Sequence, residues 1–468
     1  MYGAASGFLF MKWTDLVVTP FYIYLFYRIV AGIIDKFHPD PELRKILLRA
    51  YWIKVIGSIA VSCIYEFYYK GGDVEGYFWG SRGIYESLFE NPLVSFKLLF
   101  ISPKEILKLQ PTDPDGAEIL RYIYSRHFFN TQELTAIQVA GFTSYFNMHT
   151  YTAMALFFAM FSFAGSWKIF FLMIDEYPML KKEMAVACFY IPSVVFWGSG
   201  VLKDPITYGG VCFTIYYIFD IFVKYRFTLF KAAFLILNVF LVLLIKPYIF
   251  LCLLPAIILF VLLTNVRKIN SPVLTAMFLP FLLILFGTMT YLMANALREE
   301  LGRYALTNIT ETMESFQVWH AAEAKLSGGS GYTLGDMDYS TWGIIKKFPL
   351  AINVTFFRPY IWEARKPVIF ISALESLFIT LFVIRIMFST GIRGFFRTML
   401  SDPFILFCMM FSIIFGFAVG MSSYNFGALV RYKIPCMSFF VIGLYLINYR
   451  EKLRRENKLK AKQALKLT

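Results

Sequence analysis

Five short segments of the chain combine carboxylates or basic residues with long apolar runs. The first, GGDVEGYFWGSR (71–82), holds Asp73 and Glu75 two residues apart, with Tyr77 and Trp79 following them. Two carboxylates at this spacing suit a general base or a cation site, and the two rings could stack on a sugar. A polar turn with aromatic residues at a membrane interface explains the same pattern, and this segment alone favours neither reading.

The other four segments contribute mainly cations. An ammonium or guanidinium group can hold a phosphate, and a guanidinium can do so with two parallel hydrogen bonds. Each segment also has an ordinary explanation, because a basic residue at a helix end can extend to the headgroups or pair with a neighbouring carboxylate. The segments are SGVLKDP (199–205) with Lys203 and Asp204, LLIKPYIF (243–250) with Lys246, FFRPYIWEARKP (356–367) with Arg358, Trp362 and Glu363, and SSYNFGALVRYKIP (422–435) with Arg431 and Lys433.

The elements that must position these residues are membrane-spanning helices. Of the 468 residues, 58% are hydrophobic and 16% are charged, whereas soluble domains have about 45–50% and about 25%. Apolar blocks recur along the whole chain, which excludes a soluble enzyme, a disulfide scaffold, a disordered chain and a single-span receptor. We therefore expect an all-α, polytopic transmembrane helix bundle of about eleven spans. These are roughly residues 16–34, 50–68, 146–165, 184–200, 205–223, 228–245, 247–264, 272–294, 367–388, 402–420 and 427–448.

The distribution of basic residues predicts the orientation of the bundle. The formal net charge of +14 is concentrated in the tail and in short connections, whereas two long loops are slightly acidic. Excess lysine and arginine marks the cytoplasmic side, so the charge indicates topology and contact with membrane lipids, with no nucleic-acid partner. The C-terminus is then cytoplasmic, and all five segments lie at the outer face. The expected parts are N-terminal helices (1–68), an extracytoplasmic loop with interfacial helices (69–145), a transmembrane bundle (146–294), a second extracytoplasmic loop (295–366), C-terminal helices (367–449) and a basic tail (450–468).

The gathering of these residues on one membrane face indicates a particular chemistry. A carboxylate can activate an acceptor hydroxyl while cations stabilise a departing phosphate or pyrophosphate. That combination suits sugar transfer from a polyprenyl-linked donor. A scaffold protein has no need for it.

Several motifs resemble those of a known enzyme class. A long first outer loop with an acidic residue, interfacial helices after it and the element Arg431-Tyr432-Lys433-Ile434-Pro435 are similar to the GT-C class of integral membrane glycosyltransferases. The segments SGVLKDP, RPYIWE and FGALVRYKIP also resemble uncharacterised bacterial membrane proteins of envelope-polysaccharide loci. In the GT-C class the acidic loop usually follows the first span, whereas here it follows the second, and a WWDYG-like element is missing from this sequence.

The resemblance implies specific roles. Asp73, with Glu75 as second candidate, would be the catalytic base or would coordinate a divalent cation (Mg²⁺ or Mn²⁺), which stays open as a cofactor. Lys203, Asp204, Lys246, Arg358 and Arg431 would bind the lipid phosphate of the donor, and Tyr77, Trp79 and Trp362 would stack on a sugar or acceptor. The donor would be a polyprenyl-phosphate or diphosphate sugar, and the acceptor an envelope glycan, lipid or protein outside the cytoplasmic (inner) membrane.

Two other kinds of function fit the same membrane plan. An O-antigen-type polymerase or ligase usually depends on outer-loop arginines, so a catalytic role for Asp73 would separate it from a transferase. A lipid-glycan transporter would carry charges along the bundle interior, where we expect very few, and a non-catalytic subunit of an envelope complex would not need Asp73. The transferase predicts that Asp73, Lys203, Lys246, Arg358 and Arg431 meet at one outward-facing site.

Overall fold

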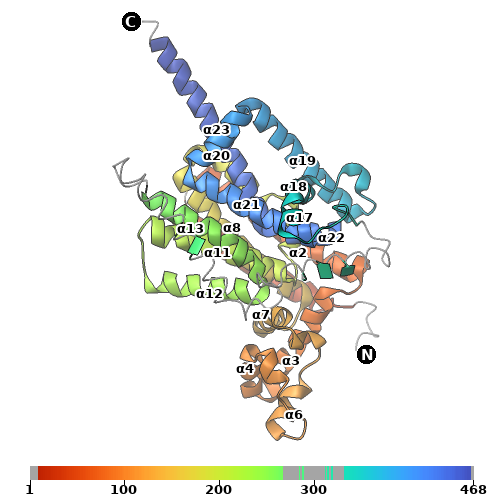
Figure 1. The fold of residues 1–468 in the computed structure, drawn as a ribbon. Helices are drawn as coiled ribbons and strands as arrows, with labels where there is room; N and C mark the ends of the chain where they lie inside the picture. The colour runs from red at the N-terminus through yellow and green to blue at the C-terminus, as the bar shows by residue number, and fades with distance from the viewer. Residues whose placement is uncertain are drawn as a thin grey trace.

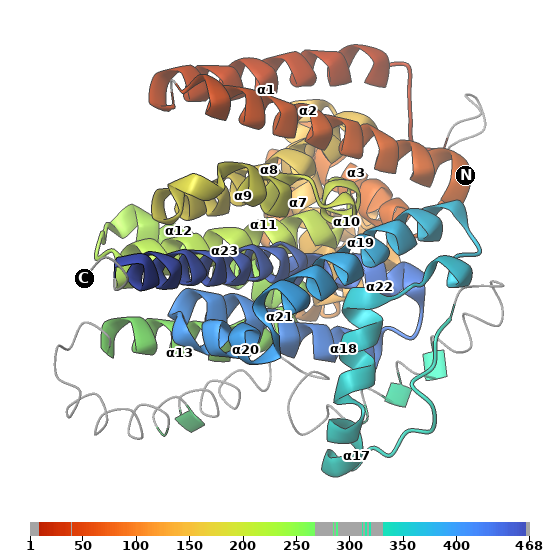
Figure 2. The same ribbon diagram turned by 90° about the horizontal axis from the view of Figure 1, so that it is seen from above.

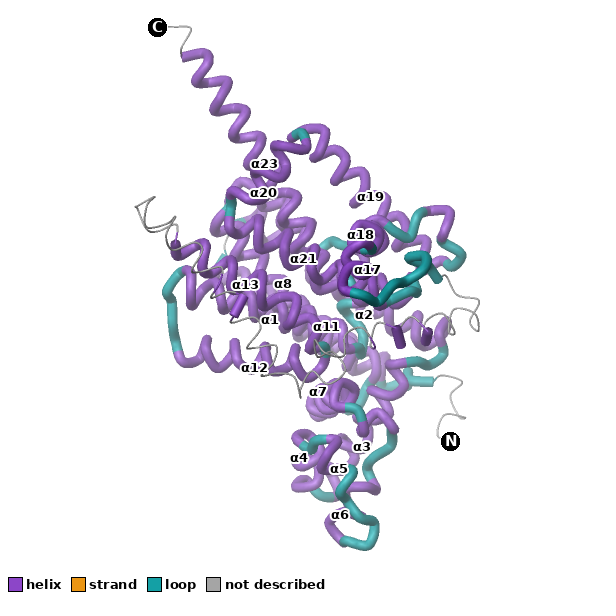
Figure 3. The backbone as a smooth tube through the Cα atoms, viewed as in Figure 1, coloured by secondary structure: helices purple, strands orange, loops and turns teal. Residues whose placement is uncertain are grey.

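A computed structural model of the chain forms an all-helical bundle in the part of the chain that it describes (Figures 1 and 3). It describes residues 9–464 apart from residue 39 and residues 267–330, of which only a few isolated positions are included. The helices before the gap are α1 (Asp15–Phe37), α2 (Pro41–Cys63), η1 (Ile64–Tyr69), α3 (Asp73–Glu90), α4 (Pro92–Phe100), α5 (Pro103–Ile106), α6 (Pro114–Arg121), η2 (Arg126–Phe129), α7 (Thr131–Asn147), α8 (Tyr151–Glu176), η3 (Pro178–Leu180), α9 (Lys181–Phe189), α10 (Pro192–Trp197), α11 (Lys203–Ile218), η4 (Phe219–Val223), α12 (Leu229–Ile245) and α13 (Pro247–Val266). Those after it are α17 (Thr341–Lys346), α18 (Phe348–Phe357), η6 (Ile361–Glu363), α19 (Pro367–Thr390), α20 (Ile392–Ser401), α21 (Pro403–Ser422), α22 (Phe426–Tyr432) and α23 (Ile434–Ala464).

Within the described residues, seven helices are long and apolar enough to cross a membrane, or eight if the bent pair α22 and α23 is one span. The molecule is therefore a multi-pass membrane protein by the length and composition of its helices. The expected count of about eleven is not confirmed. The expected span 228–245 is the shorter helix α12, 184–200 is the broken pair α9 and α10, and 272–294 lies outside the described residues.

The long helices run side by side along one direction, so the bundle has two ends (Figure 2). We call the end where α23 leaves the bundle the tail end, and the opposite end, where α3, α10 and α22 lie, the site end. Exposed ion pairs cluster at the tail end, where Asp35 pairs with Arg44 and Asp40 pairs with Lys181. The candidate residues lie at the site end.

The first long loop is a compact helical unit. Helix α3 packs against α7, and α4 to α6 lie beside them, away from the bundle axis (Figure 1). Helix α4 is held by Ser95, which donates to Ile84 O at 2.6 Å and contacts the Tyr145 hydroxyl. Its apolar residues Leu93 and Phe96 are exposed, as a helix lying on a membrane surface requires. The interfacial placement of this unit stays a prediction.

Charged side chains are buried inside the bundle, contrary to the expectation that the middles of the spans are nearly free of charge. Lys54 on α2 and Glu375 on α19 are almost fully buried, and so is Lys433 at the break between α22 and α23. Lys54 and Glu375 are each a single charge within a long apolar run. In an apolar environment, each needs a hydrogen-bonded or charged partner.

Candidate functional site

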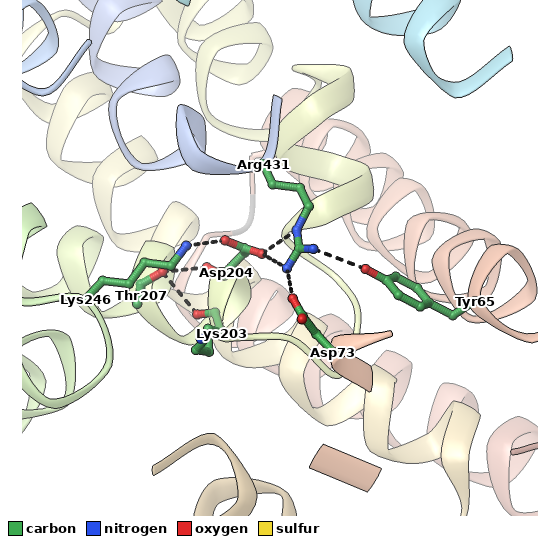
Figure 4. A network of polar contacts seen from close by, with 7 residues as sticks. All are labelled: Tyr65, Asp73, Lys203, Asp204, Thr207, Lys246 and Arg431. Carbon is green, nitrogen blue, oxygen red and sulfur yellow. Dashed lines mark hydrogen bonds and ion pairs between the residues drawn. The ribbon is translucent and has the colours of Figure 1, made fainter. Parts of the chain in front are cut away.

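Arg431 lies at the centre of a cluster of polar and charged side chains from η1, α3, α11, α22 and the end of α12 (Figure 4). Its guanidinium donates to Asp73 Oδ2 at 2.9 Å and to Asp204 Oδ2 at 3.2 Å. The other carboxylate oxygen of Asp204 accepts from Lys246 Nζ at 2.5 Å. Arg431 also donates to the Tyr65 hydroxyl at 3.4 Å. We call these five residues the Arg431 cluster.

Lys203 lies beside the cluster, next to Asp204 in the chain. Its ammonium is 5.9 Å from the centre of the Tyr77 ring, and Lys246 stands 5.0 Å from the Tyr432 ring. Cations over aromatic faces are attracted to the negative face of the ring. Both lysines are therefore held by aromatic rings as well as by the carboxylates.

A glycine turn places Asp73. Lys70, Gly71 and Gly72 have consecutive positive φ angles between the end of η1 and the start of α3. Glycine adopts these angles at no steric cost, so the chain can turn sharply here. The turn makes Asp73 the first residue of α3, where the positive end of the helix dipole also favours a carboxylate.

The starts of two helices and a one-residue connection between two others bring the remaining charges to Asp73. Asp204 lies in the first turn of α11, where Pro205 is tolerated because the first amides of a helix lack partners. Lys246 ends α12 and Pro247 begins α13, so the ammonium stays at the tip of a helical hairpin. In α22, Asn425 caps the helix by accepting from Gly427 N at 2.8 Å.

The cluster has one open side. Asp204 and Lys246 are almost fully buried, and the Arg431 side chain is 17% exposed, whereas the Asp73 side chain is 47% exposed. Lys203 adds a cation next to Asp73, and Glu133 on α7 in turn acts on Lys203, so the wider group holds three carboxylates and three cations. A half-exposed carboxylate between the cations Arg431 and Lys203 suits an anion and a polar acceptor together.

Asp73 stays ionised at neutral pH. Partial burial raises the pKa of its carboxyl, but Arg431 and Lys203 lower it further, so the pKa lies below its ordinary value. The carboxylate is therefore a hydrogen-bond acceptor at neutral pH.

The structure brings together most, but not all, of the sequence-predicted site residues. Asp73, Asp204, Lys246 and Arg431 are in contact, with Lys203 beside them. Arg358 lies apart: it pairs with Glu363 and contacts the rings of Tyr332, Tyr360 and Phe426.

The remaining candidates lie outside the contacts of the Arg431 cluster. Glu75 is exposed on α3, two residues beyond Asp73. Tyr77 is buried, with Lys203 over its ring, and Trp79 is half-buried next to Arg82. Trp362 is exposed and stacks on Tyr360. Of the predicted stacking residues, only Trp362 has a largely exposed ring.

Two residues of the site were missed by sequence reasoning. Tyr65 lies in the π-helical turn η1 that ends the second span, and Trp197 ends α10 with its ring 5.6 Å from the Arg431 guanidinium carbon. Aromatic residues near span ends are so common that neither carried a usable signal.

The arrangement does not fit a divalent metal ion. Asp73 and Asp204 share the Arg431 guanidinium, which occupies the position between them that a cation would need. In the described part of the chain, no group of three or more His, Cys, Asp or Glu side chains gathers in a way that could hold a metal. We therefore assign no step to a metal ion.

Comparison with known proteins identifies no relative: no protein-family model, no curated protein and no solved structure matches this chain.

Proposed function

We propose that this protein is a membrane glycosyltransferase of the GT-C type, which moves a sugar from a polyprenyl-phosphate donor to an acceptor at the outer face of the cytoplasmic membrane. The observation that carries the proposal is the Arg431 cluster, in which the half-exposed, ionised carboxylate of Asp73 bonds to Arg431 while Lys203 and Lys246 lie close by. The tail end, with its basic α23 extension, would face the cytoplasm. The site end would then face outward.

The cations would act on the leaving group. When the bond between the sugar and the phosphate oxygen breaks, its electron pair stays on that oxygen and negative charge grows there. Arg431, Lys203 and Lys246 stand ready to stabilise this charge, and their positions are already set before the reaction. Asp204, buried between Lys246 and Arg431, would hold these two cations in place.

Asp73 would act on the acceptor. Its carboxylate would accept a hydrogen bond from the acceptor hydroxyl and orient that oxygen toward the sugar carbon. A carboxylate with a lowered pKa is a weak base, so it would take the proton only as the new carbon–oxygen bond forms and the hydroxyl becomes acidic. The proton then goes to Asp73, the lipid phosphate leaves with the electron pair, and the acceptor oxygen forms the new bond to the sugar carbon. No further reactant is needed.

The buried charges of the bundle interior do not require a transport path. Lys54 donates to Val194 O at 3.2 Å, and Glu375 accepts from Ser193 N at 2.6 Å. Both therefore serve the backbone of α10, where a broken helix leaves polar groups without partners. This favours the transferase over a transporter.

The test is a transfer assay with purified protein in lipid nanodiscs. A panel of radiolabelled undecaprenyl-phosphate sugars is offered together with glycans and glycolipids from cells that lack the gene, and label entering the acceptor fraction is measured. We expect transfer from at least one donor, and a loss of about 100-fold or more in Asp73→Asn and Arg431→Ala.

A matched control is Glu86→Gln. Glu86 is on the same helix as Asp73 and also pairs with an arginine, Arg82, but it lies outside the cluster. It should transfer sugar at the wild-type rate. Full transfer by both Asp73→Asn and Arg431→Ala would show that the assignment is wrong.

A further inference from the structure

Two helix breaks, one between α9 and α10 and one between α22 and α23, are each connected to Arg431 by a short helix. The first separates α9 from α10 just before Pro192, whose ring cannot continue a helix with the residues before it. The second separates α22 from α23 at Lys433, where the two helices meet at 64° and Pro435 follows. Trp197 at the end of α10 stacks on Arg431, and Lys433 follows Arg431 by two residues.

One side chain joins the two breaks. Glu375, on α19, accepts from the Ser193 backbone N at 2.6 Å and from the Ser193 hydroxyl at 2.9 Å, at the start of α10. The same carboxylate lies 3.8 Å from Lys433 Nζ. Within the residues that the structure describes, the Lys433 ammonium is fully buried and has no hydrogen-bond partner. Glu375 therefore supplies the negative charge that balances Lys433.

The two contacts are connected to Arg431 through two different helices, α22 and α10. Through Lys433, Glu375 holds the C-terminal end of the short helix that carries Arg431. Through Ser193, it holds the start of α10. The last residue of α10 is Trp197, whose ring lies beneath the Arg431 guanidinium. A seven-residue helix has little stability of its own, so such contacts decide its orientation.

We propose that Glu375 is a positioning residue that orients Arg431 toward the anionic group of the ligand by tying together the two helix breaks. This inference rests on the proposed function, because it assumes that Arg431 contacts the lipid phosphate. Glu375 itself touches no ligand in this proposal. Its effect on binding passes entirely through Arg431.

A double-mutant cycle tests this dependence. The probe is undecaprenyl phosphate, which an undecaprenyl-phosphate sugar releases on transfer, and its dissociation constant is measured by native mass spectrometry of the protein in nanodiscs. The variants are Glu375→Gln, Arg431→Ala and both together. We expect Glu375→Gln to weaken binding by about tenfold in the wild-type background and by less than about twofold in the Arg431→Ala background.

Two further variants keep the experiment decisive. If Glu375→Gln fails to yield a monodisperse protein, Ser193→Ala takes its place in the cycle, since it removes one hydrogen bond to Glu375 and leaves the charge pair. Asp402→Asn is the matched control, because Asp402 pairs with Arg450 at the tail end and an asparagine can still cap α21. The control should bind as the wild type does.

The outcomes separate this inference from the proposed function. Additive effects of Glu375→Gln and Arg431→Ala, or no effect of Glu375→Gln when Arg431→Ala weakens binding, would overturn the positioning role alone. No loss of binding in Arg431→Ala would overturn both proposals. A loss in Glu375→Gln that disappears in the Arg431→Ala background supports the positioning role.

Discussion

Two arginines at the site end have similar burial but very different surroundings. The side chains of Arg431 and Arg358 are 17% and 18% exposed, and each lies against aromatic rings and carboxylates. Glu363, the partner of Arg358, is five residues away in the chain, whereas the partners Asp204 and Asp73 of Arg431 are 227 and 358 residues away. The first pair is local and the second joins distant helices.

The local pair is complete in itself. Glu363 accepts two hydrogen bonds from Arg358 and a third from the Tyr360 backbone N at 2.8 Å, so neither charge is left over. In the Arg431 cluster, by contrast, the side chain of the partner carboxylate Asp73 is 47% exposed, against 18% for Glu363. A closed pair fixes a turn, whereas a cluster with an accessible carboxylate can bind a ligand. The comparison teaches that neither residue type nor burial separates the two arginines, but the exposure of their partner carboxylates does.

The largest effect is expected for Asp204→Asn. The change leaves Lys246 and Arg431 with less negative charge in a buried site, where breaking a charge pair costs about 3–5 kcal/mol. We expect sugar transfer to fall below detection and the thermal midpoint, measured by fluorescence-detected size exclusion, to drop sharply. Asp35→Asn, in the exposed pair with Arg44, should change neither property. A stable Asp204→Asn protein with normal transfer would show that the cluster is not the site.

A smaller effect is expected from acid. Because the pKa of Asp73 is lowered in the folded protein, its pairing contributes stability above the ordinary carboxyl pKa of about 3.9 and loses it as the pH falls through the lower folded value. The difference in thermal midpoint between the wild type and Asp73→Asn should therefore stay constant from about pH 7 to about pH 5 and shrink only below about pH 4. A difference that disappears above about pH 5 would mean that burial outweighs the cations.

Much of the fold could be predicted from the sequence because it depends on long apolar runs. Those runs located most of the described spans, and the basic clusters indicated which ends of the helices belong together. The sequence predicts one continuous span over 184–200, because the apolar residues continue across Pro192. The structure has two helices there, α9 and α10. Hydropathy measures the length of an apolar run and does not record where the backbone changes direction.

The site was predicted less completely for a geometric reason. Lys203 and Asp204 are neighbours in the chain, yet Asp204 lies between Lys246 and Arg431 whereas Lys203 lies over the Tyr77 ring, because one residue turns a helix by about 100°. The rotation of each helix about its axis is set by packing against distant segments. The local pair of Arg358 with Glu363 is the alternative that the sequence offers for that segment, whereas the contacts of Arg431 across the bundle depend on packing between distant segments.

The smallest effect is expected for Glu363→Gln, which breaks the local pair. Arg358 would lose its charged partner but keep its contacts with Tyr332 and Phe426, so we expect a stability loss of about 1–3 kcal/mol. Transfer should change by less than about threefold, since Arg358 keeps its contact with Phe426 on α22 and Arg431 keeps its own partners Asp73 and Asp204. The assay is the same nanodisc transfer reaction, run at a temperature where the variant is folded. A loss as large as that in Arg431→Ala would place Arg358 at the ligand, and the contrast between a closed pair and an open cluster would no longer identify the site.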